Sequence, residues 1–236
     1  MEEEILNKFQ NELLEYPNFT LNFVCSEKGK TKLANELSEV ERIRLLHPQG
    51  YVDFVGEIKS NEDEADYERT GVDLDTIKLS KSELTGMAMI KDSKLMDEVL
   101  SLGGGSTFGR LAKKFIHNSP AIGLLSSKNS GKDIWYNAGR IVERLWLRFE
   151  ELGLGFQPQS PLSFLKEENP IKTVSKGSND FNATISSIYK RVIKIAELSK
   201  HDHIHFVFWL NRKSLLGPKS KRLPIDQHFI RKNGTG

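Results

Sequence analysis

Residues 133–155 constrain the fold of this chain more than any other stretch. They read DIWYNAGRIVERLWLRFEELGLG, and apolar side chains recur there every three or four positions. One helical face collects Ile134, Ala138, Ile141, Val142, Leu145, Phe149 and Leu152, whereas Arg140, Glu143, Arg144 and Arg148 lie off it. This periodicity predicts an amphipathic helix that buries one face in a core. Gly153 suits the left-handed position just beyond the helix end.

Three other stretches have the patterns of strands. Residues 19–25 (FTLNFVC) and 203–211 (HIHFVFWLN) alternate in the period of two that an extended chain imposes. Residues 120–127 (PAIGLLSS) are apolar on both faces, which favours a buried strand. Further helices are expected near residues 3–15, from the N-cap Ser26 to His47, and near 51–59, 92–101, 105–117 and 180–199. Residues 60–82 are acidic and polar, and this composition predicts an exposed connector.

Charge and cysteine content exclude several classes of protein. The 34 basic and 32 acidic residues leave a formal charge of +2, too balanced for a chain that binds nucleic acid or a membrane surface over its whole area. Cys25 is the single cysteine, so no disulfide framework can form. The N-terminus lacks the features of a signal peptide, and no apolar run approaches the ~20 residues of a membrane-spanning helix. We expect a soluble, cytoplasmic protein with no membrane or nucleic-acid partner.

The glycine-rich stretch SLGGGSTFGRLAKK (101–114) suggests a phosphate-binding loop but fits neither common template. Arg110 and Leu111 follow Gly109, where a P-loop needs Lys and then Ser or Thr, and Phe108 stands where a dinucleotide fingerprint needs glycine or alanine. The stretch also follows a helical pattern and not a strand. We therefore expect Gly103 to Gly105 to end one helix and Ser106 to cap the next.

Other candidate chemistry is weak. His201, His203 and His205 would share one side of a strand, but the sequence offers no cysteine or acidic fourth ligand nearby, so no metal site is expected. The carboxylates of NEDEADYE (61–68) are typical of a solvated loop. No motif indicates nucleophilic catalysis, and any enzyme activity would use the chemistry of a cofactor. No catalytic residue is nominated.

Two stretches remain that could bind a ligand. Lys219, Lys221 and Arg222 gather in GPKSKRLP (217–224), a basic group suited to a phosphate. LGLGFQPQ (152–159) is expected to be a turn whose glycines let a planar ligand approach the backbone. Each stretch also has a plainer interpretation. The basic group suits a solvated tail or a contact to nucleic acid, and the two glycines suit a helix C-cap.

In their order along the chain these motifs resemble the FMN-dependent nitroreductase family. They are similar to the second half of its double-length members, and to nitroreductase-like regions joined to adenylating domains of the ubiquitin-activating type. The resemblance covers roughly residues 5–228, and its most specific part is AGRIVERLWL followed by LGLGFQP. It implies an α+β fold, with a mostly antiparallel central sheet flanked by helices and a helical lid insertion. It further implies a single domain over 1–230, with the connector and lid in 60–118 and a flexible tail at 231–236.

The same resemblance implies a cofactor and its contacts. FMN would lie at an interface between two domains or subunits, take a hydride from NAD(P)H at N5 and pass electrons to a nitroaromatic, quinone or similar acceptor. Gly155, Phe156 and Gln157 match the backbone that faces the flavin ring. Lys221 and Arg222 match the basic pair that binds the FMN phosphate, and Lys219 matches it less closely.

The chain departs from the family in one respect. An Arg-Arg-Ser-x-Arg segment that grips the FMN phosphate does not occur in residues 1–60, and the nearest candidate, Arg42-Ile43-Arg44, lies within a predicted helix. A homodimer, or an upstream or partner nitroreductase-like half, would then have to complete the site. The alternative is a non-catalytic interaction or flavin-sequestering module of the same fold.

Overall fold

The computed structural model describes residues 3–59, 70–77, 79–102, 105–167, 181–212 and 223–224. These residues form two compact units. One unit contains residues 3–44 and 105–212, and the other contains 45–102 with 223–224. Gly155, Phe156 and Gln157 of the candidate site lie in the first unit, which we describe first.

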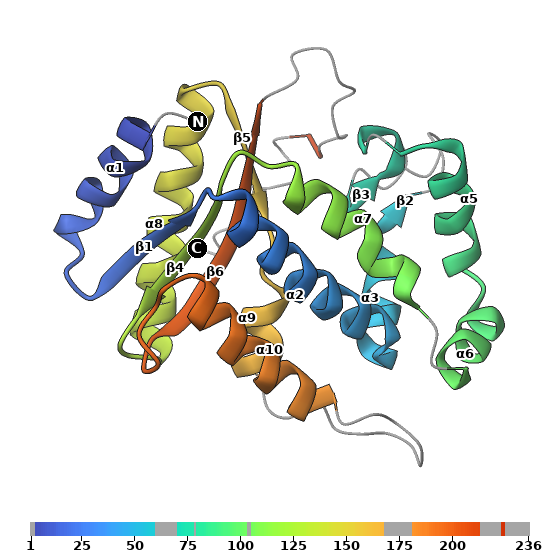
Figure 1. Cartoon of the computed structure of the whole chain (residues 1–236). Helices are drawn as coiled ribbons and strands as arrows, with labels where there is room; N and C mark the ends of the chain where they lie inside the picture. Colours follow the sequence, from blue (N-terminus) through green and yellow to red (C-terminus); the bar gives the residue numbers. More distant parts are fainter. Residues whose placement is uncertain are drawn as a thin grey trace, which may run out of the picture. The chain divides into compact units, whose positions relative to one another are not determined.

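A four-stranded sheet forms the centre of the first unit (Figure 1). Its strands are β1 (Phe19–Val24), β4 (Ile122–Ser127), β5 (Leu154–Pro158) and β6 (His203–Arg212). The order across the sheet is β1-β4-β6-β5, and every neighbouring pair is antiparallel. All six residues of β4 are buried, as its two-sided apolar pattern predicted.

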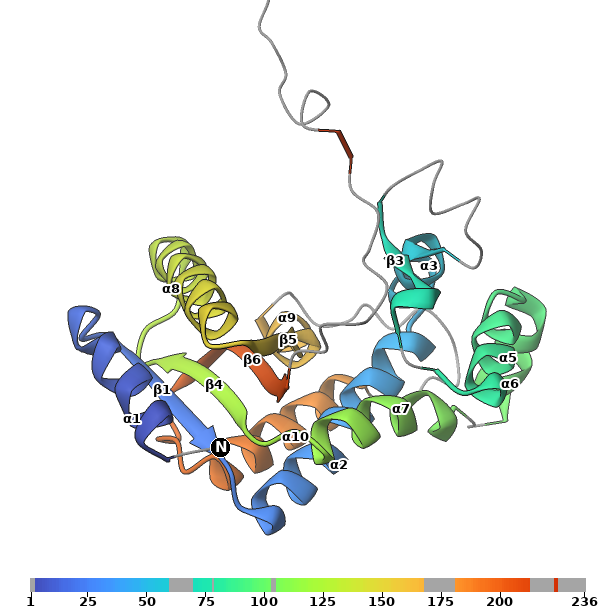
Figure 2. The ribbon, with the colours of Figure 1, turned by 90° about the horizontal axis from the view of Figure 1, so that it is seen from above.

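Helices cover both faces of this sheet (Figure 2). α1 (Glu3–Glu12), its 3-10 extension Leu13–Glu15 and α8 (Lys132–Glu151) lie on one face. α2 (Glu27–Leu46), α7 (Ser106–His117) and α10 (Phe181–Ile195) lie on the other. There Phe115 of α7 stacks on Trp209 of β6, with ring centroids 5.9 Å apart, and the Tyr189 hydroxyl of α10 accepts a hydrogen bond from the Ile204 amide. The α+β prediction, with an antiparallel sheet flanked by helices, is confirmed.

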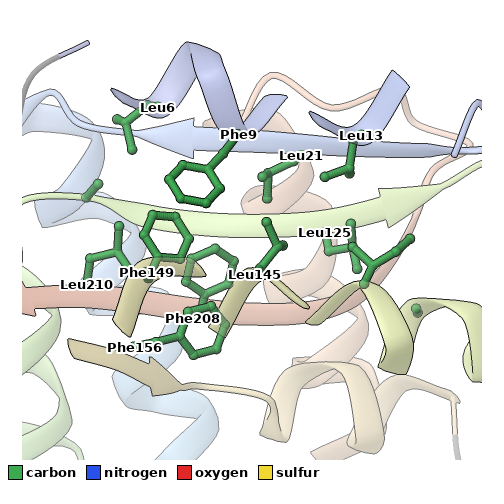
Figure 3. Packing of buried hydrophobic residues seen from close by; sticks show 13 residues of the cluster. Leu6, Phe9, Leu13, Leu21, Leu125, Leu145, Phe149, Phe156, Phe208 and Leu210 are labelled. Atoms are coloured by element: carbon green, nitrogen blue, oxygen red, sulfur yellow. The ribbon is translucent and has the colours of Figure 1, made fainter. Parts of the chain in front are cut away.

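The apolar face of α8 anchors the core (Figure 3). Ala138, Ile141, Leu145 and Phe149 are buried at the predicted spacing. The Phe149 ring is fully enclosed and stacks on Phe9 of α1, with 4.0 Å between ring centroids. Leu152, expected on the same face, is exposed because the helix has already ended at Glu151. Gly153 takes the predicted left-handed conformation, with φ of 68°, and donates its N–H to the Glu150 carbonyl.

Gly123 leaves space for an aromatic side chain at the centre of the core. It lies on β4 directly opposite Phe208 of β6, and a Cβ at position 123 would collide with the Phe208 ring. That ring in turn packs on Phe156 with 4.2 Å between centroids, and lies 6.0 Å from the ring of Phe149. The absence of a side chain at Gly123 therefore makes room for the aromatic centre of the core.

The second unit has its own short elements. These are α3 (Pro48–Glu57), β2 (Ile58–Lys59), β3 (Val72–Asp73), a 3-10 turn at Leu74–Thr76, α5 (Lys81–Ile90) and α6 (Ser93–Ser101). β2 and β3 pair in parallel, and the Tyr51 hydroxyl donates to the Ile90 carbonyl at 2.8 Å. The connector expected at 60–82 thus contains structure from residue 72 onward, and its residues 60–69 lie outside the described part.

The first residues of the helices confirm one predicted N-cap, contradict another, and include a capping box that was not predicted. Ser26 caps α2 as predicted, since its Oγ accepts from the Gly29 amide. Ser106 is not the cap of α7: Gly105 holds that position with φ of 88°, and Ser106 is the first helical residue. α5 was missed, although Ser80 and Glu83 form a reciprocal capping box that the Ser-x-x-Glu pattern encodes.

Two of the broader expectations concern the whole chain. No helix in the part of the chain described here has the length and apolar character needed to cross a membrane. The single domain over 1–230, the lid within 60–118 and the tail at 231–236 remain predictions. Within the proposed insertion, α5 and α6 belong to the second unit, whereas α7 belongs to the unit with the sheet.

Substitution of Phe149 on α8 tests the packing of this core. We expect Phe149→Ala to lower the free energy of unfolding by about 3–5 kcal/mol, because it leaves a cavity among Phe9, Phe156 and Phe208. Phe164→Ala removes the same atoms from a side chain that is 59% exposed and should cost far less. Urea denaturation of both variants measures the difference; equal losses would contradict the packing described.

Candidate functional site

Strand β5 carries three of the predicted site residues. Gly155, Phe156 and Gln157 pair with Asn211, Leu210 and Trp209 of β6. The expected turn over LGLGFQPQ is therefore wrong in extent: only Leu152 and Gly153 form it, and the chain then runs as a strand. β5 is the last strand in the sheet order, so one edge of its backbone has no strand partner among the described residues.

The three residues have different surroundings. Phe156 is buried between Trp146 and Phe208, with ring centroids 5.1 and 4.2 Å away, so its ring belongs to the core and only its backbone could face a ligand. Gln157 is exposed. A Cβ at Gly155 would collide with the side-chain amide of Asn211, so glycine allows that amide to lie against the strand.

A buried polar cluster follows directly after β5. Gln159, Ser160 and Ser163 are only 8%, 6% and 4% exposed. Gln159 donates from Nε2 to Oε1 of Glu41 on α2 at 2.7 Å, and its backbone N–H donates to the Val207 carbonyl of β6 at 2.7 Å. These bonds fix the end of β5 against the α2 side of the sheet. We call Glu41, Gln159, Ser160 and Ser163 the β5-end cluster.

The two serines of the cluster have unused hydroxyls. Ser160 and Ser163 each enclose an Oγ that has no hydrogen-bond partner within the described chain. Ser160 directly precedes α9 (Pro161–Glu167), where a serine hydroxyl commonly caps the helix, yet it makes no such bond here. An unsatisfied buried polar group costs about 1–3 kcal/mol, so Ser160 and Ser163, three residues apart, are two destabilising positions in this region.

Gln159, Ser160 and Ser163 were not among the predicted site residues. Ser160 followed by Pro161 is a pattern typical of a helix start, and it could have indicated α9. Nothing in the sequence indicates that the two hydroxyls lack partners, because that depends on which groups the fold brings near them.

The free backbone edge of β5 is the part of this region that could meet the planar ring of FMN, since Gln157 is exposed and backbone N–H and C=O groups can pair with the polar edge of such a ring. The Ser160 and Ser163 hydroxyls are enclosed by protein atoms and are closed to a ligand in this structure. The FMN phosphate would need cations. Lys219, Lys221 and Arg222, which were predicted for that role, lie outside the described residues.

Arg42 and Arg44 do not take the place of the missing Arg-Arg-Ser segment. Both lie inside α2, as predicted, with Ile43 fully buried between them. Arg42 donates to both carboxylate oxygens of Glu39, at 2.9 and 2.6 Å, and this hydrogen-bonded carboxylate raises the pKa of the guanidinium above its ordinary value. Arg44 Nε lies 3.1 Å from Glu41 Oε2. These arginines bind carboxylates of their own helix.

The three histidines are not one ligand set. His201 precedes β6, while His203 and His205 lie within it. His205 Nε2 is 2.8 Å from the hydroxyl of Ser127 on β4, a cross-strand hydrogen bond. In the described ranges no three His, Cys, Asp or Glu side chains are grouped so that they could hold a metal ion.

Comparison with known proteins gives solved structures only. No family model and no curated protein matches the chain. Its structural neighbours are nitroreductase-like proteins. They include a nitroreductase-like family protein from Bacillus cereus, which is 12% identical with a TM-score of 0.45, over 99% of this chain and 87% of that one.

Two more neighbours are described as nitroreductases. The FMN-bound nitroreductase of Bacteroides fragilis is 10% identical with a TM-score of 0.43, over 98% of this chain and 88% of its own. The FMN- and NADPH-dependent nitroreductase NfnB from Sphigopyxis sp. strain HMH is 13% identical with a TM-score of 0.47, over 98% and 89%. They are from the family that the sequence motifs resemble. At these identities and TM-scores the likeness says nothing about the activity of this chain.

The unused hydroxyls generate a stability prediction. We expect Ser160→Ala and Ser163→Ala to leave the free energy of unfolding unchanged or slightly higher, because neither substitution breaks a hydrogen bond. The matched control is Ser119→Ala, equally buried, whose Oγ donates to the Ile116 carbonyl at 2.6 Å and whose loss should cost about 1 kcal/mol. Chemical denaturation without ligand compares them. A loss at 160 or 163 as large as at 119 would show that those hydroxyls have partners.

Proposed function

We propose that this chain is an FMN-dependent NAD(P)H oxidoreductase of the nitroreductase type. The observation that carries the proposal is the backbone of Gly155, Phe156 and Gln157, which lies on the last strand of the sheet and has one edge without a strand partner among the described residues. The basic group of Lys219, Lys221 and Arg222 in the sequence supports it from the phosphate side.

Each residue has a defined part in this proposal. The backbone of Gly155, Phe156 and Gln157 would lie along the flavin ring. Lys221 and Arg222, with Lys219 as a further cation, bind the phosphate. FMN, when bound, supplies the hydride and electron chemistry toward a nitroaromatic or quinone-like acceptor.

The proposal includes a partner and a compartment. Because the Arg-Arg-Ser segment is absent from residues 1–60, a second copy of this chain, or a nitroreductase-like half, completes the phosphate grip. A reducing, cytoplasmic setting agrees with the one exposed cysteine, Cys25, which leaves the chain without internal disulfides.

FMN titration tests the cofactor. The wild-type protein should quench the fluorescence of FMN and perturb its absorbance. Lys221→Ala combined with Arg222→Ala should weaken binding by at least about a hundredfold, since two charge-assisted hydrogen bonds are lost. Lys128→Ala combined with Lys132→Ala removes the same charge from exposed positions and should leave affinity unchanged. A protein that neither binds millimolar FMN nor gains thermal stability from it would exclude this function.

A second candidate function rests on the missing segment alone. A non-catalytic module of the same fold would bind or sequester flavin without transferring electrons. Oxidation of NADH and NADPH, followed at 340 nm with several nitroaromatic and quinone acceptors, separates the two candidates. FMN binding with no turnover in any combination would favour the non-catalytic module.

A further inference from the structure

Helices α2, α7 and α10 form a positively charged layer on one face of the sheet (Figure 2). They lie close together: a Cβ at Gly109 of α7 would collide with the Ser38 carbonyl of α2, and Arg191 of α10 donates to both carboxylate oxygens of Glu36 on α2. The three helices contain eleven lysines and arginines but only four carboxylates, an excess of seven positive charges. We call α2, α7 and α10 the basic layer.

The helices on the other face of the sheet have the opposite balance. α1, its 3-10 extension and α8 contain five basic and eight acidic residues. This unit is therefore electrically polarised across its sheet, although the formal charge of the whole chain is only +2. Such a separation gives the basic layer a positive potential that attracts anionic partners.

The four carboxylates of the basic layer are all held in ion pairs within it. The N···O distances are 2.6 to 3.1 Å in the pairs Glu27–Lys30, Glu36–Arg191, Glu39–Arg42 and Glu41–Arg44. The excess charge therefore belongs to the other seven cations. All seven are exposed, and they are Lys28, Lys32, Arg110, Lys113, Lys114, Lys190 and Lys194.

These seven cations are regularly spaced. On each helix they recur at intervals of three or four residues, which places them on one side of that helix. Side chains at this spacing have Cβ atoms about 5–6 Å apart, and carboxylates at positions i and i+4 of another helix have the same spacing. The basic layer thus matches the acidic face of a partner helix in both sign and interval.

The composition of the basic layer disfavours other anionic partners. Among the described residues of its three helices no large apolar side chain is exposed, so none can enter a bilayer or stack on a base. The carboxylates of α2 lie among the cations, where they would repel a continuous line of phosphates. A second copy of this chain would have to present its α1 and α8 side, and that head-to-tail contact does not close.

We propose that the basic layer is a docking surface for another protein, one that presents a helix with carboxylates at three- and four-residue spacing. Each contact joins exposed charges and contributes little alone, so the affinity comes from several pairs formed together and falls as the salt concentration rises. Complementary charges of this kind act mainly on the association rate and on the choice of partner. Docking here needs no flavin, so its failure is distinguishable from a failure to bind FMN.

Fluorescence anisotropy of a labelled model helix measures this docking on the full chain. The probe is an alanine-rich peptide of ~20 residues, long enough to be helical in water, with glutamates at three- and four-residue intervals along one face. A control peptide has the same composition, with the glutamates distributed around the helix. We expect the wild-type protein to bind the probe at about 20 mM salt, to bind it at least about tenfold less tightly at about 150 mM, and to bind the control peptide more weakly.

Charge reversal on α7 locates the contact. Lys113→Glu combined with Lys114→Glu should weaken binding of the probe at least about tenfold, because two attractions become two repulsions. Lys128→Glu combined with Lys132→Glu makes the same change in net charge at exposed positions outside the basic layer, and should weaken binding about twofold at most. Circular dichroism should show native helix content in both variants, since all four side chains are exposed.

Charge reversal on α10 makes the result independent of α7. Lys190→Glu combined with Lys194→Glu should weaken binding of the probe to a similar extent. No binding of the probe at low salt, equal binding of the control peptide, or an equal loss from the reversals outside the basic layer would each overturn the proposal. So would tighter binding, in the same buffer, of a ~20 bp duplex DNA or of vesicles with about 30% phosphatidylserine.

Discussion

The stack of aromatic rings between α8 and the sheet is the contact on which the rest of this unit depends. Phe149 meets Phe9 on one side and approaches Phe156 and Phe208 on the other, so a single side chain joins α1, α8 and two strands. Apolar burial of this kind is the main favourable term in folding, and it fixes the rotation of α8 about its own axis. That rotation determines which side chains remain outside.

The position of β5 follows from the same helix. α8 ends at Glu151, Gly153 turns the chain in the left-handed region, and Leu154 already pairs with Arg212 of β6. The strand can begin this early because the Phe156 ring enters the stack that Phe149 has formed. Gln159, Ser160 and Ser163 follow β5 on the α2 side of the sheet, where Glu41 accepts a hydrogen bond from the side-chain amide of Gln159. A core contact thereby places the polar residues of the candidate site.

The sequence predicted long or strongly patterned elements and missed short ones. α8 and β6 have several apolar residues each at a fixed period, and β4 is a continuous apolar run, so these patterns do not depend on the details of packing. β5 has five residues and α9 has seven, too few for a period to show, and both depend on neighbours that are distant in sequence. The error at Ser106 has a local cause: a left-handed glycine at Gly105 serves as the N-cap where a serine hydroxyl was expected.

The sequence predicted some features of the candidate site and not others. Gly155, Phe156 and Gln157 were predicted as site residues because they belong to a motif. Their strand conformation was not predicted, since it depends on pairing with β6. The unpartnered state of the Ser160 and Ser163 hydroxyls is a property of the three-dimensional surroundings and has no sequence pattern. Lys219, Lys221 and Arg222 are known here from sequence alone.

The contact between Gly123 and the Phe208 ring also has an evolutionary consequence. A larger residue at position 123 would need a smaller one directly across the strand pair, at position 208. Two positions 85 residues apart in the chain are thus limited by one shared volume. Among chains of this fold, their sizes should vary inversely, and a homologue with alanine or valine at the first should have lost the aromatic ring at the second.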